Sequence, residues 1–263
     1  MKLREKSIDD FCQIIGLKKD VEVDNSLNLF KKWTQEGYLA KKRKEIGPAY
    51  WIPVHSFNTG IYAGLISKKI DDDESWIWDA NNFLWKEKPN IKEKSKTVIL
   101  GNLLHDYGKP YIKCPELLDF KDGINFNQKS MIKKHSLIGF LKLNYQTSIF
   151  NGYTNEVSYI SKFHHERPDG SGYLGLKNLS IGLIITMISD NIDGRTSKRP
   201  YTKQVSMKKA LKDINEEYDH YLEIFKQSDS KNKEYKRYVY KTIIGIVNEI
   251  PFKDYKVDVL HIK

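Results

Sequence analysis

Cysteine is scarce in this sequence, and its scarcity excludes two kinds of structure. The 263 residues include two cysteines, Cys12 and Cys114. Two cysteines supply neither a disulfide framework nor a cysteine-rich metal cage, so we expect reduced thiols in an intracellular protein. A chain of this length also buries enough surface to fold without such cross-links.

Long hydrophobic runs are missing as well. The longest apolar stretch, Ile181 to Ile188, is far shorter than the roughly 20 residues that span a bilayer. The segment Met1 to Lys6 leads into no apolar region of the kind found in a signal peptide. We therefore expect a soluble, cytoplasmic protein with no membrane partner.

Acidic residues are outnumbered by basic ones. Lysine and arginine total 44 against 34 aspartates and glutamates, which gives a formal net charge of +10. A basic balance favours anionic partners such as nucleotides or nucleic acid. The lysines are dispersed, however, and the one compact run is Lys41 to Lys44. The charge alone therefore gives weak support for a phosphate-containing substrate.

Alternating patterns typical of strands are absent between His55 and Ser228, where apolar residues recur at helical spacing. An all-α fold is therefore predicted. The expected helices are Thr97 to Lys109 (ending at Gly108), Met131 to Leu143, Glu156 to His165, Leu179 to Asp193 and Ser206 to Phe225.

Three regions are expected along the chain. Residues 1–45 form an N-terminal helical extension, because apolar residues recur at helical spacing from Lys2 to Lys44. Residues 46–228 form the catalytic domain. Residues 229–263 form a linker and a C-terminal element packed on that domain, in which Tyr255 to Ile262 alternates enough for a short strand.

Histidine and aspartate form an ordered series along the predicted helices. Imidazole and carboxylate suit borderline and hard divalent metals, and so many ligands are most simply explained by two metal ions side by side. Such a pair generates hydroxide and holds a phosphate at the same time, which predicts a metal-dependent phosphohydrolase. The series contains five of the seven histidines: His55, His105, Asp106, His135, His164, His165 and Asp190.

The pair His105 and Asp106 occupies the centre of this series. Neighbouring residues on a helix point about 100° apart, so both side chains can reach a site between their directions. The two oxygens of Asp106 can bridge two cations. Lys109 follows one turn later, where its ammonium can meet a phosphate oxygen.

The order of these motifs resembles the HD superfamily of metal-dependent phosphohydrolases, and within it the HD-GYP subfamily. The resemblance covers roughly His55 to Phe225 and implies an HD-domain helical bundle, to which the helical N-terminal segment is a short extension. The motifs that carry it are Leu103 to Lys109 (Leu-Leu-His-Asp-Tyr-Gly-Lys), His135 to Gly139, His164 to Tyr173, Ile188 to Asp190 and Arg199 to Tyr201.

The resemblance also implies a ligand set and a mechanism. A hydroxide that bridges two divalent ions, most often iron or manganese, would attack phosphorus in line. Asp106 and Lys109 would be catalytic, with Lys109 on the scissile phosphate. One metal would be held by His55, His105, Asp106 and Asp190, and the other by Asp106, His135, His164 and His165.

Members of this subfamily hydrolyse cyclic dinucleotides, typically cyclic di-GMP. Lys109, Arg199 and Lys203 would suit a substrate with two phosphates, and Tyr173 and Tyr201 are expected to stack on the nucleotide or hydrogen-bond it. Two alternatives stay open. One is an HD-type phosphohydrolase or nuclease that acts on other nucleotides or single-stranded nucleic acid. The other is a metal-binding receptor. A homodimer also stays open.

The sequence departs from the family pattern at four places. Leu174 replaces the proline of the Gly-Tyr-Pro signature, which is expected to change the loop geometry. Trp51 stands where some members carry a third-metal glutamate, which favours two metals. Thr202, with Lys203 after it, follows Arg-Pro-Tyr where a basic residue is usual. Arg195 is an additional candidate anion contact.

Overall fold

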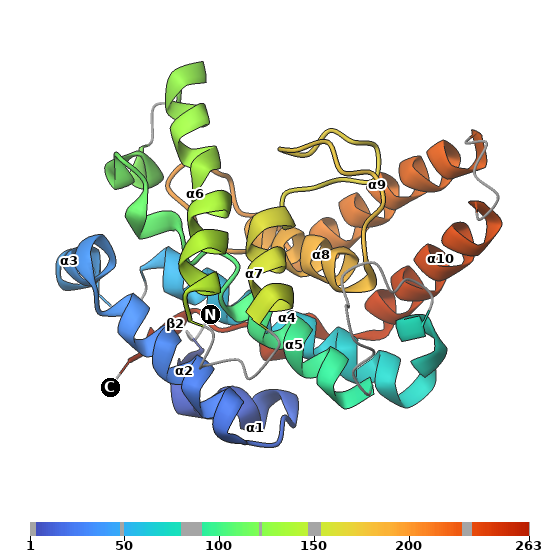
Figure 1. Ribbon diagram of the computed structural model, residues 1–263, viewed down its shortest axis with the longest axis horizontal. Coiled ribbons are helices and arrows are strands. Elements are labelled where there is room, and N and C mark those ends of the chain that lie inside the picture. Colours follow the sequence, from blue (N-terminus) through green and yellow to red (C-terminus); the bar gives the residue numbers. More distant parts are fainter. Residues whose placement is uncertain are drawn as a thin grey trace.

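Helices make up almost all of the structure (Figure 1). This computed structural model describes residues 4–47, 50–79, 91–120, 123–146, 154–227 and 233–262. The predicted all-α fold is confirmed. Short 3-10 helices connect the main elements at Ile8–Asp10, Ser75–Asp79, Lys109–Tyr111 and Pro115–Asp119.

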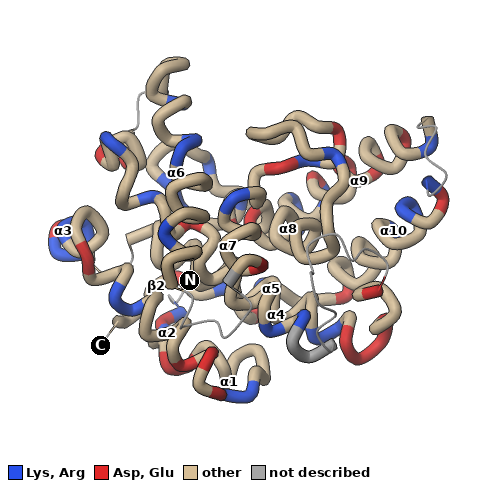
Figure 2. The backbone as a smooth tube through the Cα atoms, in the orientation of Figure 1, with Lys and Arg blue, Asp and Glu red and all other residues tan. Residues whose placement is uncertain are grey.

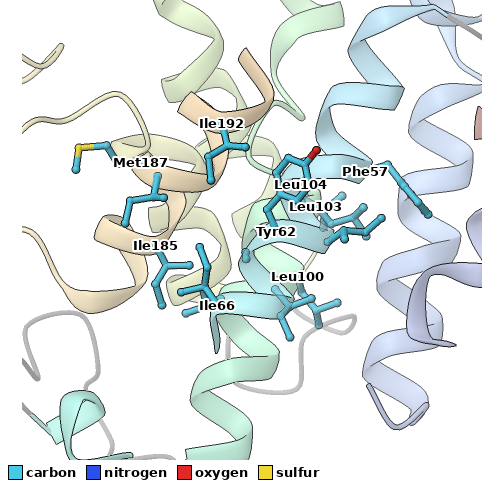
Figure 3. Close-up of a cluster of buried hydrophobic side chains, with 14 of the residues drawn as sticks. Phe57, Tyr62, Ile66, Leu100, Leu103, Leu104, Ile185, Met187 and Ile192 are labelled. Atoms are coloured by element: carbon cyan, nitrogen blue, oxygen red, sulfur yellow. The ribbon is translucent and has the colours of Figure 1, made fainter. Parts of the chain in front are cut away.

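Helix α4 (Trp51–Asp73) lies at the centre of the bundle and packs against α5 (Ile91–Leu103) and α8 (Ile181–Thr196). It is buried on all sides from Trp51 to Gly64, as expected of a helix enclosed by others. Figure 3 shows the interface of α4 with α5 and α8, which contains Phe57, Tyr62, Ile66, Leu100, Leu103, Leu104, Ile185, Met187 and Ile192. None of the helices in the described ranges has the length and apolar character needed to cross a membrane.

Helices α6 (Phe126–Asn144) and α7 (Thr154–Phe163) pack against each other, and α7 also packs on α5. The start of α6 is fixed by a capping box, in which the Asn125 side chain accepts from the backbone of Gln128 and the Gln128 side chain accepts in return. Ser180 caps α8 by accepting from the backbone N–H of Leu183. These caps set where the histidine-bearing helices begin.

The two ends of the described chain meet in a small sheet. Strand β1 (Glu5–Ser7) pairs in parallel with β2 (Val259–His261), with Glu5 opposite Val259. The predicted C-terminal strand is therefore found. The prediction that residues from Lys2 onward are helical is wrong at Glu5–Ser7, because this pairing joins residues about 254 positions apart and leaves no local pattern.

The N-terminal helices share one hydrophobic core with the rest of the bundle. Phe11 of α1 contacts the ring of Phe57 in α4, and Trp33 of α2 donates its indole N–H to the backbone oxygen of Tyr107. The elements are α1 (Phe11–Ile15), α2 (Val21–Thr34) and α3 (Gly37–Ile46).

The C-terminal region adds a helical hairpin, α9 (Met207–Gln227) and α10 (Lys233–Glu249), and the short helix α11 (Phe252–Tyr255). The α9–α10 pair extends to one side of the bundle (Figure 1). Helix α9 is confirmed close to its expected position at Ser206 to Phe225, because its apolar face packs on α8 and α10.

Helix α5 ends at Leu103, earlier than the predicted end at Gly108. The chain then turns towards α6, and the two backbones come into contact. A Cβ at Gly108 would overlap the carbonyl oxygen of His135 and lie 2.6 Å from the nitrogen of Gly139. Glycine at 108 and 139 therefore permits the contact that brings the His105–Asp106 turn beside α6.

We predict that Gly108→Ala destabilises the protein. The backbone angles of Gly108 suit any residue (φ −79°), so the cost is steric overlap, about 1–3 kcal/mol. Thermal unfolding measures it. The control is Gly245→Ala in α10, where an added Cβ would meet no atom within 4 Å. This substitution should stabilise the helix by about 1 kcal/mol or less, because alanine has a higher helix propensity than glycine. Equal stability of Gly108→Ala and the unmodified protein would contradict the close approach.

Candidate metal centre

The seven predicted ligands converge on one buried region from five parts of the chain. His55 lies in α4, His135 in α6 and Asp190 in α8. The other four lie in the turns directly after α5 and α7. Because the backbone leaves the helix at these turns, two adjacent side chains can point into the same space. The residues in the turns are His105, Asp106, His164 and His165.

One half of the cluster contains the four residues predicted for one metal. The Nε2 atom of His55 lies 3.2 Å from the Nε2 of His105 and 3.2 Å from an oxygen of Asp190. Asp106 Oδ2 lies 3.5 Å from His55 Nε2 and 3.3 Å from His105 Nε2. All four side chains therefore face a common point.

The other half contains the ligands predicted for the second metal. The Nε2 atoms of His135 and His164 lie 3.1 Å apart, and Asp106 Oδ1 lies 3.3 and 3.6 Å from them. The His165 ring lies beside them, and one ligand atom each of His135, His164 and His165 fits within 4.8 Å of the others. Asp106 thus presents one oxygen to each half of the cluster.

Three of the histidines are held in the same way. The Nδ1 atoms of His105, His135 and His164 each lie 2.7 or 2.8 Å from the carbonyl oxygen of the residue three positions earlier. A carbonyl oxygen only accepts, so each Nδ1 carries the hydrogen and each Nε2 presents a lone pair to the cluster. This is the usual orientation of histidines that bind metals.

His55 is oriented by a carboxylate. Its Nδ1 lies 2.7 Å from Asp193, which also accepts from Asn58 at 2.9 Å and Ser197 at 2.7 Å. Burial disfavours the charged form of Asp193, but His55 outweighs it and lowers the pKa of that carboxyl. Asp193 was not among the residues predicted for the site. Its position three residues after Asp190, on the same helical face, was the available signal.

The cluster carries charges that suit cations. Burial raises the pKa of Asp106, but His105 and Lys109 outweigh it and hold that pKa well below its ordinary value. Burial, together with neighbouring imidazoles, holds the pKa values of His164 and His165 well below the ordinary range. Asp106 Oδ1 is buried and has no hydrogen-bond partner among the described residues. Facing lone pairs and an unpartnered carboxylate oxygen fit divalent metal ions.

A pocket of about 680 Å³ opens beside the cluster and is lined by His135 and His165. Four of the five predicted substrate contacts line it as well: Lys109, Tyr173, Arg199 and Tyr201. Lys203, the fifth, is exposed and is not among its lining residues.

Trp51 forms a platform for two cations of this pocket. Its ring lies 5.0 Å from the Lys109 ammonium and 5.2 Å from the Arg199 guanidinium carbon, within the range of cation–π attraction. Lys109 also pairs with Asp106. From the sequence, Trp51 was predicted only to replace the glutamate of a third metal. Its contacts come from residues far apart in the chain, so no local pattern revealed them.

The glycine-rich loop after His165 is held by Glu166. Its buried carboxylate accepts the backbone N–H groups of Leu174 at 2.8 Å and Leu176 at 2.6 Å. A proline at position 174 has no N–H, so the departure from the family signature adds a hydrogen bond here. The loop places the Tyr173 ring 4.4 Å from the His165 ring.

Arg195 does not face the pocket. It pairs with Asp213 at 3.4 Å and with Glu217, both on α9. These carboxylates neutralise its charge, so the expectation of an additional anion contact at Arg195 is wrong.

Helices that gather histidine and aspartate ligands in this order define a metal-binding helical domain. The sequence profile of the HD domain matches residues 54–195, more than half of the chain. The chain therefore belongs to the HD domain family, as the motifs predicted.

Three curated relatives match parts of this chain. A cyclic di-GMP phosphodiesterase of Thermotoga maritima is 35% identical over 115 residues, which are 42% of this chain and 30% of the relative. The cyclic di-GMP phosphodiesterase response regulator RpfG of Xanthomonas campestris is 32% identical over 124 residues, or 46% and 32%. A 3'3'-cGAMP-specific phosphodiesterase 1 of Vibrio cholerae is 32% identical over 123 residues, or 45% and 27%. The match thus spans about a third of these relatives or less.

We predict that Asp106→Ala loses metal from both halves of the cluster, because one carboxylate faces both. Metal content measured by mass spectrometry should fall below one ion per chain, while the circular dichroism spectrum should remain that of a helical protein. The control is Asp72→Ala, which removes an exposed carboxylate near the end of α4. Full metal content in Asp106→Ala would exclude a bridging role.

We predict that Asp193→Asn lowers metal affinity about 10–100-fold, because the orienting partner of a ligating histidine loses its charge. A competition titration with a coloured chelator measures the affinity. Asp254→Asn, at a carboxylate that is 68% exposed, should leave it unchanged. An unaltered affinity in Asp193→Asn would show that His55 is oriented by other contacts or does not bind metal.

Proposed function

We propose that this protein is a metal-dependent phosphodiesterase of the HD-GYP type that hydrolyses a cyclic dinucleotide, either cyclic di-GMP or a related molecule. The observation that carries the proposal is the opening of a seven-residue ligand cluster onto a pocket with a cationic lining. The relatives named as cyclic-dinucleotide phosphodiesterases support the same substrate class.

The cluster would hold two divalent ions, iron or manganese. Its nitrogen and oxygen donors suit such ions. When bound, the ions supply Lewis acidity that generates a nucleophile at neutral pH and offsets charge on the phosphate. His55, His105 and Asp190 would hold one ion and His135, His164 and His165 the other, with Asp106 shared.

The chain's own catalytic groups are Asp106 and Lys109. Asp106 holds the Lys109 ammonium at the edge of the cluster, and the Trp51 ring lies 5.0 Å from the same ammonium. Lys109 is 7% exposed and lines the pocket, so its charge acts on a phosphate oxygen with little screening by water. Arg199 lies on the same platform and binds a neighbouring phosphate oxygen. Tyr173 provides a ring against which a base can stack.

The second candidate is an HD-type phosphohydrolase or nuclease for other nucleotides or single-stranded nucleic acid. The net charge of +10 favours it. Lysine and arginine are spread over several helices, including α3, α6 and α10 (Figure 2). A single strand would track a continuous basic groove, so this dispersed distribution favours the smaller substrate.

Hydrolysis of a substrate panel tests the two candidates. The protein is purified anaerobically and supplied with manganese or iron, then given cyclic di-GMP, 3'3'-cGAMP, cyclic mononucleotides and short single strands. Chromatography resolves the products. We expect turnover of a cyclic dinucleotide, with at least a 10³-fold loss in Asp106→Ala, since one change disrupts both metal sites. Faster cleavage of the single strands than of either cyclic dinucleotide would support the second candidate instead.

A further inference from the structure

The pocket beside the metal cluster is lined by two pairs of cations from different parts of the chain. On the cluster side, Lys109 and Arg199 have partners: Lys109 pairs with Asp106, and Arg199 lies 3.9 Å from Asp193. Both also rest on the Trp51 ring. These contacts fix the two cations next to the metal ligands, where the phosphate that is cleaved must bind.

Helix α6 supplies the other cations. Lys129 and Lys133 line the pocket and lie four residues apart, so they share one face of the helix. Lys133 Nζ lies 4.8 Å from the centre of the Tyr173 ring. Within the part of the chain that the structure describes, neither lysine forms an ion pair with a carboxylate. As far as the described residues go, both charges are therefore available to a ligand in the pocket.

Their distance from the cluster follows from helix geometry. His135 lies on the same helix, and a rise of about 1.5 Å per residue places Lys133 about 3 Å and Lys129 about 9 Å further along its axis. Along the helix axis, Lys129 therefore lies further from the metal ligand His135 than Lys133 does. A single phosphate at the cluster can contact Lys109 and Arg199, but it leaves Lys129 without an anion.

Apolar side chains also line the pocket. They are Leu117, Leu118, Phe120, Ile124 and Ile132. A lining that combines apolar surface with two pairs of cations suits a ligand that carries two anionic groups joined by sugars and flat bases. The pocket volume of about 680 Å³ is within the usual range for sites of small molecules and cofactors.

We propose that Lys129 and Lys133 bind the second phosphate of a cyclic dinucleotide, the phosphate that is not cleaved. This inference rests on the proposed function and adds a subsite to it. The expected contact after the Arg-Pro-Tyr element is missing from the pocket, because Thr202 and Lys203 are exposed and do not line it. Helix α6 therefore supplies the charge that selects substrates with two phosphates.

The test compares two substrates in the unmodified protein and in three double variants. Cyclic di-GMP carries two phosphates, whereas bis(p-nitrophenyl) phosphate is a diester with one. We measure kcat/KM for both and take the ratio. The double variant Lys129→Gln/Lys133→Gln should lower the ratio at least tenfold, mainly through KM for cyclic di-GMP, because a charge-assisted hydrogen bond to phosphate is lost at each position. The variant Lys129→Arg/Lys133→Arg, which keeps both charges, should stay within about threefold.

The matched control is Lys134→Gln/Lys142→Gln. Both lysines lie on α6 and neither lines the pocket, so the net charge falls equally and the ratio should not change. A ratio that falls as much in this control as in the Lys129/Lys133 variant would reduce the effect to overall charge and overturn the subsite. An unchanged ratio in the Lys129/Lys133 variant, with cyclic di-GMP hydrolysed, would overturn the subsite alone. No hydrolysis of cyclic di-GMP by the unmodified protein, with bis(p-nitrophenyl) phosphate cleaved, would overturn the proposed substrate and the subsite together.

Discussion

The arrangement of the site depends on one buried carboxylate. Asp106 presents an oxygen to each half of the histidine cluster and also holds Lys109. A buried carboxylate keeps its charge only where opposite charges or donors surround it, and burial here is complete. The packing of α4, α6, α7 and α8 around the end of α5 therefore also stabilises the ionised form of Asp106, because it supplies the groups that surround the carboxylate. The same helix packing thus determines both the fold of the bundle and the charge at the site.

Two glycines meet the steric demand that this carboxylate creates. The turn that carries Asp106 can lie beside His135 only if the backbones of α6 and the turn touch, and they touch at Gly108 and Gly139. Once the backbones are in contact, local hydrogen bonds from Nδ1 to the preceding turn orient the imidazoles of His105, His135 and His164. The glycines in the family motifs thus have a packing role, and the histidines next to them are aligned by their own helices.

The sequence was sufficient to predict the helices, the family and the histidines and aspartates that the fold brings into one cluster, because these depend on local periodicity and on spacing within motifs. It did not reveal Trp51 as a cation platform or β1 as a strand, since both depend on contacts between distant segments. Asp193 is an intermediate case, because its spacing from Asp190 was visible but its contact with His55 came from another helix. Lys129 and Lys133 had no motif around them, so only the pocket distinguishes them from other surface lysines.

Helix α6 contributes to two functions of the proposed enzyme. Its buried face carries His135 into the ligand cluster, and its pocket face carries Lys129 and Lys133. A rigid helix fixes the distance between a metal ligand and a phosphate contact more strictly than a loop does. The loop element Arg-Pro-Tyr keeps Arg199 at the cluster but leaves Thr202 and Lys203 outside the pocket. A second-phosphate contact on α6 therefore fixes the distance between the two phosphate-binding positions, because the same helix carries the metal ligand His135.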